Sequence, residues 1–99
     1  MARFDVYRNA GGSGYLLDVQ SDLLSDLNTR VVVPLMPVDQ APRPARHLNP
    51  VFEIENAQVV MVTQFLAAIP ATELKRPLCG LQSAQDEIRA ALDLLFVAF

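Results

Sequence analysis

The chain has 99 residues, which is enough for one domain, residues 1–99, with a modest core. Because 52 % of the residues are hydrophobic and only 19 % are charged, the composition argues against a disordered protein. The formal net charge of −3 argues against a protein that relies on contacts with nucleic-acid phosphates.

The chain opens with a pattern typical of a half-buried β-strand. Residues 3–8 alternate, with Phe4 and Val6 on one face and Asp5 and Tyr7 on the other. This start lacks the apolar segment of a signal peptide, and no later stretch approaches the length of a membrane span. We therefore expect a cytoplasmic protein.

The next elements are two strands joined by an unusual connection. A glycine-rich loop, residues 9–14, lacks the lysine and the strand–loop–helix context of a phosphate-binding loop, so we interpret it as a hairpin connection. The predicted strands cover residues 15–20 and 30–36. Between them, "SDLLSDLN" at 21–28 carries two acids and three leucines. One interpretation is that these leucines close the end of a barrel.

The residue pattern in the middle of the chain predicts a long loop followed by a β-hairpin. Three prolines in residues 37–46 indicate an exposed, extended loop. Alternation returns in residues 47–56, and an "EN" turn leads into a further strand at 58–65. Prolines and a glycine leave room only for short strands in residues 69–81.

The last segment, residues 83–99, changes to the period of a helix. Ser83 is the predicted N-cap, with Asp86 three residues later in the first turn. Apolar residues recur at spacings of three and four, at Ile88, Ala91, Leu92, Leu95 and Phe99. Because the chain ends while still apolar, this end is expected to meet a partner or a second subunit.

These elements predict a mainly β fold, an antiparallel barrel-like sheet with one C-terminal helix. The apolar content exceeds what a small monomer hides easily, so we expect a homodimer.

Residues able to perform catalysis are few. His47, the only histidine, follows the proline-rich loop and is expected at the surface. Cys79, the only cysteine, allows no intramolecular disulfide and fits a reducing cytoplasm. Asp18 and Asp22 fit turn formation and capping better than acid–base or metal chemistry. We expect no catalytic residues, no metal and no cofactor.

Four stretches, "LLDVQSDLL", "TRVVVPL", "PVFEIEN" and "DEIRAALDLLFVAF", resemble the CcdB family, the toxins of type II CcdA/CcdB toxin–antitoxin modules. The resemblance runs from "FDVYR" to the terminal helix. It implies an SH3-like antiparallel barrel with a small extra β-hairpin and a C-terminal helix, in a homodimer similar in fold to the MazF/Kid toxins. It also implies a protein that is not an enzyme, which binds the A subunit of DNA gyrase, traps the cleaved DNA complex and is neutralised by a CcdA-like antitoxin.

The resemblance also implies binding residues. Gyrase contacts are expected after "DVQ" and along the end of the terminal helix, at Ser21, Leu23, Leu24, Asp93, Phe96, Val97, Ala98 and Phe99. Antitoxin contacts are expected, by position only, in the two loops that contain Gly11, Gly12, Arg43 and Arg46.

One departure from the family concerns the C-terminus. Well-characterised gyrase poisons of the family end in Trp-Gly-Ile, whereas this chain ends in Val97-Ala98-Phe99 and contains no tryptophan. Asp93 stands where an asparagine is common. Two alternatives therefore remain open, namely a CcdB homologue with weakened or altered gyrase binding and an endoribonuclease like the MazF toxins.

Overall fold

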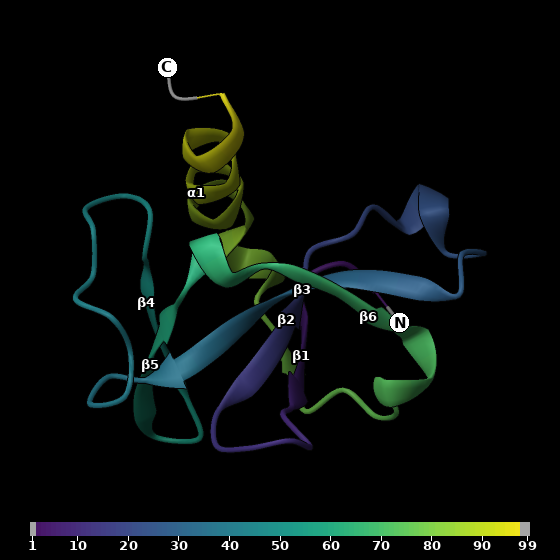
Figure 1. Ribbon diagram of the computed structural model, residues 1–99, viewed down its shortest axis with the longest axis horizontal. Coiled ribbons are helices and arrows are strands. Elements are labelled where there is room, and N and C mark those ends of the chain that lie inside the picture. Colours follow the sequence, from purple (N-terminus) through teal and green to yellow (C-terminus); the bar gives the residue numbers. More distant parts are fainter. Residues whose placement is uncertain (1, 98–99) are drawn as a thin grey trace.

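Seven antiparallel strands form one sheet in the computed structural model, which describes residues 2–97 (Figure 1). The strands are β1 (Asp5–Arg8), β2 (Tyr15–Asp18), β3 (Thr29–Pro37), β4 (Val51–Ile54), β5 (Ala57–Met61), β6 (Ala67–Pro70) and β7 (Cys79–Gly80). One α-helix, α1 (Gln85–Phe96), follows the last strand. The described residues also contain four single turns of 3-10 helix: η1 (Asp22–Leu24), η2 (Thr63–Phe65), η3 (Ala71–Glu73) and η4 (Gln82–Ala84). The predicted mainly β class with one C-terminal helix is confirmed.

The long strand β3 organises the sheet. The strand order is β4-β5-β3-β2-β1-β7, and β6 pairs with β3 outside this path. The first half of β3 pairs with β6 through residues 29–32, and the second half pairs with β5 through residues 35–37. Pro34, which has no backbone donor, lies between these two pairings. The sheet curls around β3 into a half barrel.

Two apolar clusters lie on opposite faces of the sheet. The larger one includes Phe4 and Val6 of the N-terminal segment and Ile88 and Ala91 of α1, all buried. The smaller one contains Tyr7, together with Val32 and Leu74. The predicted alternation of β1 is therefore confirmed, and both of its faces are covered.

Positive backbone angles explain two connections. In the β4–β5 hairpin, Glu55 and Asn56 have φ values of 52° and 66°, as a two-residue type I′ turn requires, which agrees with the predicted "EN" turn. Gly14 has a φ of 88°, and a Cβ there would lie 2.4 Å from the carbonyl oxygen of Leu35. Only glycine fits that position without strain.

Several predicted boundaries are wrong. The first strand begins at Asp5, because Phe4 has a φ of 73° and is not extended. The second strand ends at Asp18, and the strand predicted at 58–65 ends at Met61 before the turn η2. These segments bend where their ends leave the sheet.

The predicted N-cap of the helix is also wrong. Ser83 lies inside η4, and the residue that caps α1 is Ala84, which makes no side-chain hydrogen bond. The 3-10 turn places Ser83 too early for its hydroxyl to reach the first amides of α1. The helix period was predicted correctly, since Ile88 and Ala91 are buried and Leu92 and Leu95 are partly buried. Within residues 2–97, no helix is both long enough and apolar enough to cross a membrane.

Candidate partner-binding surface

The connection between β2 and β3, residues 19–28, exposes its leucines to solvent. Leu23 is 94 % exposed, and about half of Leu24 and of Leu27 is exposed. The interpretation that these leucines close the end of the barrel is therefore wrong. Exposing an apolar side chain to water costs free energy, and a partner that covers the leucine removes that cost.

Gln20 closes the base of this connection. Its side-chain amide donates hydrogen bonds to the carbonyl oxygens of Leu24 and Thr29 at 3.2 and 3.1 Å. Its side-chain oxygen accepts one from the backbone amide of Val31 at 3.0 Å. Because one side chain joins both ends of the connection, the backbone that carries the exposed leucines is held in place.

A buried ion pair contacts the backbone of Gln20. The Nε of Arg30 donates to Oδ1 and Oδ2 of Asp18 at 3.2 and 3.0 Å, and Nη2 donates to Oδ2 at 2.6 Å. Nη2 also donates to the backbone oxygen of Gln20 at 3.3 Å. Burial raises the pKa of the Asp18 carboxyl, and the hydrogen bonds from Arg30 oppose that rise. The sequence analysis missed this pair because two charges twelve residues apart carry no local signal that they are buried together.

Two further contacts shape the tip of the connection. The hydroxyl of Ser21 accepts a hydrogen bond from the backbone amide of Leu23 at 3.2 Å and so caps η1. Asp22 accepts one from the backbone amide of Arg3 at 2.9 Å and lies 3.6 Å from Arg30. The capping role expected for Asp22 is replaced by these longer-range contacts, and it is Ser21 that caps the turn.

The end of α1, residues 93–97, forms a second exposed apolar surface. Phe96 is 69 % exposed, and about half of Val97 is exposed. Asp93 is exposed too, and its carbonyl oxygen accepts a hydrogen bond from the amide of Val97 at 2.7 Å. Ala98 and Phe99, which the resemblance also assigns to this surface, lie outside the described residues.

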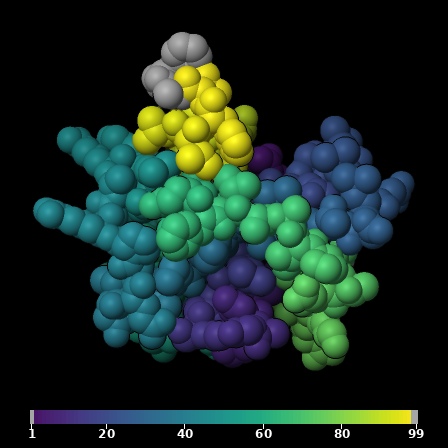
Figure 2. Space-filling model, viewed as in Figure 1, coloured from purple at the N-terminus to yellow at the C-terminus, as the bar shows by residue number. Residues whose placement is uncertain are grey.

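The connection and the end of α1 project from the same side of the molecule. In Figure 1, α1 rises at the upper left and the connection stands out at the upper right, with β6 running below them across the sheet. The space-filling view in Figure 2 shows them as two separate projections with a hollow between. One copy of the chain therefore places both expected gyrase-binding segments on one side without bringing them into contact.

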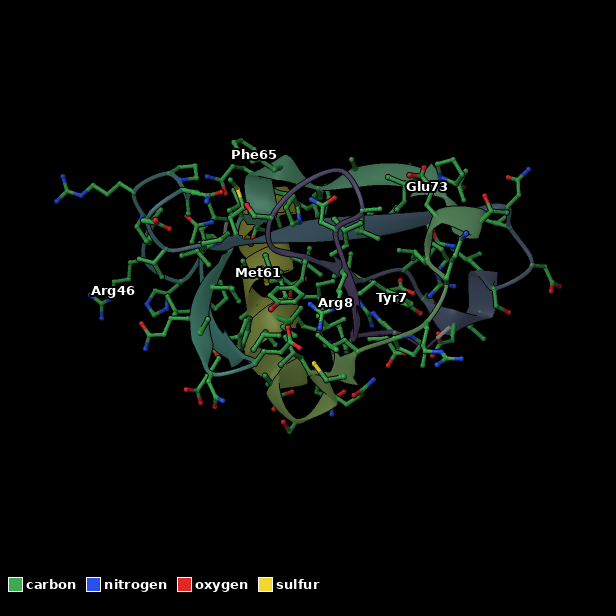
Figure 3. The ribbon with its side chains drawn as sticks, turned by 90° about the horizontal axis from the view of Figure 1, so that it is seen from below. Tyr7, Arg8, Arg46, Met61, Phe65 and Glu73 are labelled. Atoms are coloured by element: carbon green, nitrogen blue, oxygen red, sulfur yellow. The ribbon has the colours of Figure 1, made fainter. Side chains whose placement is uncertain are left out.

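The two loops expected to meet an antitoxin come together elsewhere. Gly11, Gly12, Arg43 and Arg46 are all exposed. The hydroxyl of Ser13 donates a hydrogen bond of 2.7 Å to the side-chain oxygen of Gln40, which joins the first loop to the second. Arg46 extends away from the body of the protein in Figure 3.

The residues with catalytic chemistry do not converge. His47 is exposed in a loop, as predicted, with a φ of 65°. Cys79 is an exposed free thiol whose pKa is raised by partial burial. Among residues 2–97, no group of three His, Cys, Asp or Glu side chains is placed to hold a metal ion. The projections described above are suited to binding a partner.

Comparison with known proteins gives one family and one fold. Residues 3–97 match the family model described as "CcdB protein". A solved endoribonuclease in complex with its cognate antitoxin, from a mycobacterial species, is similar with a TM-score of 0.73 and 19 % identity, over 94 % of this chain and 91 % of that chain. A second mycobacterial endoribonuclease has a TM-score of 0.71 and 18 % identity, over 94 % of this chain and 88 % of that one. At such identities these two structures show a shared fold.

Proposed function

The chain belongs to the CcdB family, and from this membership we propose that it is a toxin that binds the A subunit of DNA gyrase and traps the cleaved DNA complex. Family membership supports the broader statement that the protein is the toxin of a toxin–antitoxin system. Gyrase as the target is the more specific step, and it depends on the surface described above.

The observation that carries this step is Leu23. Leu23 is 94 % exposed on a connection whose backbone is held by Gln20 and by the Asp18–Arg30 pair, so little backbone freedom is lost when a partner binds there. The end of α1 adds the exposed Phe96 on the same side. Large apolar side chains on fixed elements are typical of the few residues that dominate binding energy at protein interfaces.

Besides gyrase, the proposed partners are a second copy of the chain and an antitoxin, and the protein acts in the cytoplasm. A second copy of the chain forms a homodimer, which covers part of the exposed apolar surface. An antitoxin binds beside the loops that hold Gly11, Gly12, Arg43 and Arg46, where the two arginines attract an acidic tail.

The experiment that tests the proposal mixes the purified protein with gyrase, supercoiled plasmid and ATP, and then denatures the gyrase. Linear plasmid that appears only when both proteins are present supports trapping of the cleaved complex. The same reaction with a gyrase carrying a resistance substitution in its A subunit is the control. Full supercoiling activity with no linear product contradicts the proposal.

The second candidate is an endoribonuclease, which the shared fold with the two mycobacterial endoribonucleases favours. Against it stand the net charge of −3 and the exposed, isolated position of His47. Incubation with total RNA in EDTA separates the two candidates, because RNA cleavage assigns the protein to the nucleases. A third outcome, binding of antitoxin without either activity, identifies a family member with weakened or altered gyrase binding.

A further inference from the structure

A further feature of the surface is an open groove of about 680 Å³. It runs between β1 on one side and η3 with the segment that follows it on the other. Its walls include Tyr7, Arg8, Thr72, Glu73, Lys75 and Arg76. Tyr7 and Glu73 line opposite sides of this groove and lie at the same end of the molecule in Figure 3. The volume falls within the range of roughly 300–1,000 Å³ that binding pockets occupy.

The groove concentrates positive charge on an acidic protein. Three of the eight Lys and Arg residues line it, against one acid, Glu73, while the whole chain has a net charge of −3. Arg8 is paired with Glu55 at 2.6 Å. Lys75 and Arg76 are exposed and form no ion pair with any residue in 2–97. These two side chains are therefore free to meet an anionic group.

Tyr7 adds a buried hydrogen-bond donor. The residue is 2 % exposed, and within residues 2–97 its hydroxyl is the buried side-chain group left without a hydrogen-bond partner. Burial and the nearby Asp5 raise the pKa of Tyr7, so the hydroxyl keeps its proton. Buried polar groups are nearly always paired, so an unpaired one beside a groove needs an explanation, and an oxygen atom of a ligand supplies one.

We propose that this groove binds an acidic segment of the antitoxin, whose carboxylates contact Lys75 and Arg76 and accept a hydrogen bond from Tyr7. The choice of an antitoxin rests on the proposed function. Ala10, which also lines the groove, belongs to the same loop as Gly11 and Gly12, so the groove continues the surface already assigned to the antitoxin. Pro77 and Leu78 offer apolar contacts beside the charges.

A short acidic peptide fits this charge distribution better than RNA. A peptide brings a few carboxylates into a local positive site, whereas a polyanion must also approach the negative remainder of the protein. The groove is thus selective for a ligand whose charge is confined to one short segment.

The test uses a fluorescent peptide that alternates glutamate and leucine, with a glutamine–leucine peptide as its neutral counterpart. At physiological ionic strength, we expect the acidic peptide to bind at least about tenfold more tightly than the neutral one. Arg76→Glu lowers the affinity for the acidic peptide by about tenfold or more. Arg89→Glu makes the same change of charge on the exposed part of α1 and changes the affinity by less than about twofold.

Tyr7→Phe is the second arm of the test. It removes only the unpaired hydroxyl, so it lowers the peptide affinity severalfold without lowering the melting temperature. A merely structural tyrosine shows the opposite pattern, with a lower melting temperature and unchanged binding, and that result overturns the proposal.

Two other outcomes also overturn it. Equal effects of Arg76→Glu and Arg89→Glu mean that general charge attraction explains the binding. An oligouridine that binds more tightly than the peptide, and loses affinity in Arg76→Glu, assigns the groove to RNA. Because none of these measurements involves gyrase, formation of linear plasmid by Arg76→Glu separates failure of this proposal from failure of the proposed function.

Discussion

Asp18 and Arg30 form a two-pronged ion pair from which water is excluded, with 0 % and 1 % of their side chains exposed. The pair joins the end of β2 to the start of β3, and Asp18 also accepts a hydrogen bond from the amide of Gln20 at 3.1 Å. It therefore fixes the two ends of the connection that presents Leu23. A buried ion pair thus fixes the shape of the exposed segment that we propose as a binding surface.

We predict that Asp18→Asn lowers the free energy of unfolding by about 3–5 kcal/mol, because it leaves the buried guanidinium of Arg30 with only the more distant carboxylate of Asp22, at 3.6 Å. Urea unfolding at a fixed protein concentration measures the loss. Asp26→Asn, at an exposed position in the same connection, is the matched control and changes the free energy by no more than about 0.5 kcal/mol. A similar small change in Asp18→Asn contradicts the role given to the pair.

The fold was largely predictable because its strands follow local rules. The alternation in β1, the "EN" turn and the helical spacing of Ile88 and Ala91 each depend on residues close together in the sequence. The start of α1 was not predictable from Ser83, since η4 inserts an extra turn before the helix. A capping pattern does not reveal whether a 3-10 turn precedes the first helical residue.

The candidate surface was predictable only in part. The resemblance pointed to Leu23 and Phe96, and both are exposed in the structure. Periodicity alone allowed Leu23 to be a core residue, because a leucine in an irregular segment has no face assigned to it. The roles of Asp18 and Tyr7 depend on burial and on contacts between distant segments, which no local pattern encodes.

We predict that Leu23→Asp weakens binding to a gyrase A-subunit fragment by at least about 2 kcal/mol and leaves stability unchanged. The side chain is almost fully exposed, so the substitution removes no core contact, but it places a charge at the proposed interface. Calorimetry and thermal melts measure the two effects. Val38→Asp, a half-exposed valine in the loop after β3, is the control and retains normal affinity. Normal affinity in Leu23→Asp excludes the connection as a gyrase contact.

We predict an acid-side loss of stability that depends on Glu55. The hydroxyl of Tyr15 and the guanidinium of Arg8 donate hydrogen bonds to this carboxylate at 2.7 and 2.6 Å and hold its pKa below the ordinary value, Tyr15 having the larger effect. A lowered folded-state pKa means that the contribution to stability is complete above the unfolded-state pKa, about 4.3, and is lost as the pH falls through the folded-state pKa.

The measurement for Glu55 is an NMR titration of its side-chain carboxyl carbon. Tyr15→Phe raises the pKa towards its ordinary value and narrows the pH range over which this stability is lost. Tyr7→Phe, which removes a hydroxyl that makes no hydrogen bond to any described residue, leaves the titration of Glu55 unchanged. Coincident titration curves for the wild type and Tyr15→Phe reject the assignment.

We predict that the protein is a dimer at micromolar concentration. Phe65, Leu94, Phe96 and Val97 are exposed on or near α1, which is more apolar surface than a small monomer usually leaves uncovered. Sedimentation equilibrium over a dilution series gives the mass directly. A monomer mass at every concentration contradicts the prediction.

We predict that deletion of residues 97–99 lowers the affinity for the gyrase fragment by about 2 kcal/mol or more without unfolding the domain. The buried helix residues, Ile88 and Ala91, lie well before the deletion, whereas Val97 is half exposed. Thermal melts of the shortened and full-length proteins should therefore nearly coincide. A shortened protein that melts normally and binds gyrase as tightly as the wild type shows that the contact lies elsewhere.

We predict that Val97→Trp strengthens gyrase binding. Position 97 matches the tryptophan of the well-characterised gyrase poisons that the chain resembles, and an indole there adds a large, flat apolar surface. Because Val97 is about half exposed beside the 69 % exposed Phe96, the larger side chain extends into solvent and does not displace the core. Calorimetry with the gyrase fragment measures the gain, and Val38→Trp controls for a general effect of added aromatic area.

If Val97→Trp brings no gain, the double variant Asp93→Asn with Val97→Trp tests the remaining difference, because the charge of Asp93 lies one helical turn away on the same exposed segment. Failure of the double variant as well means that the surface is directed at a partner other than gyrase.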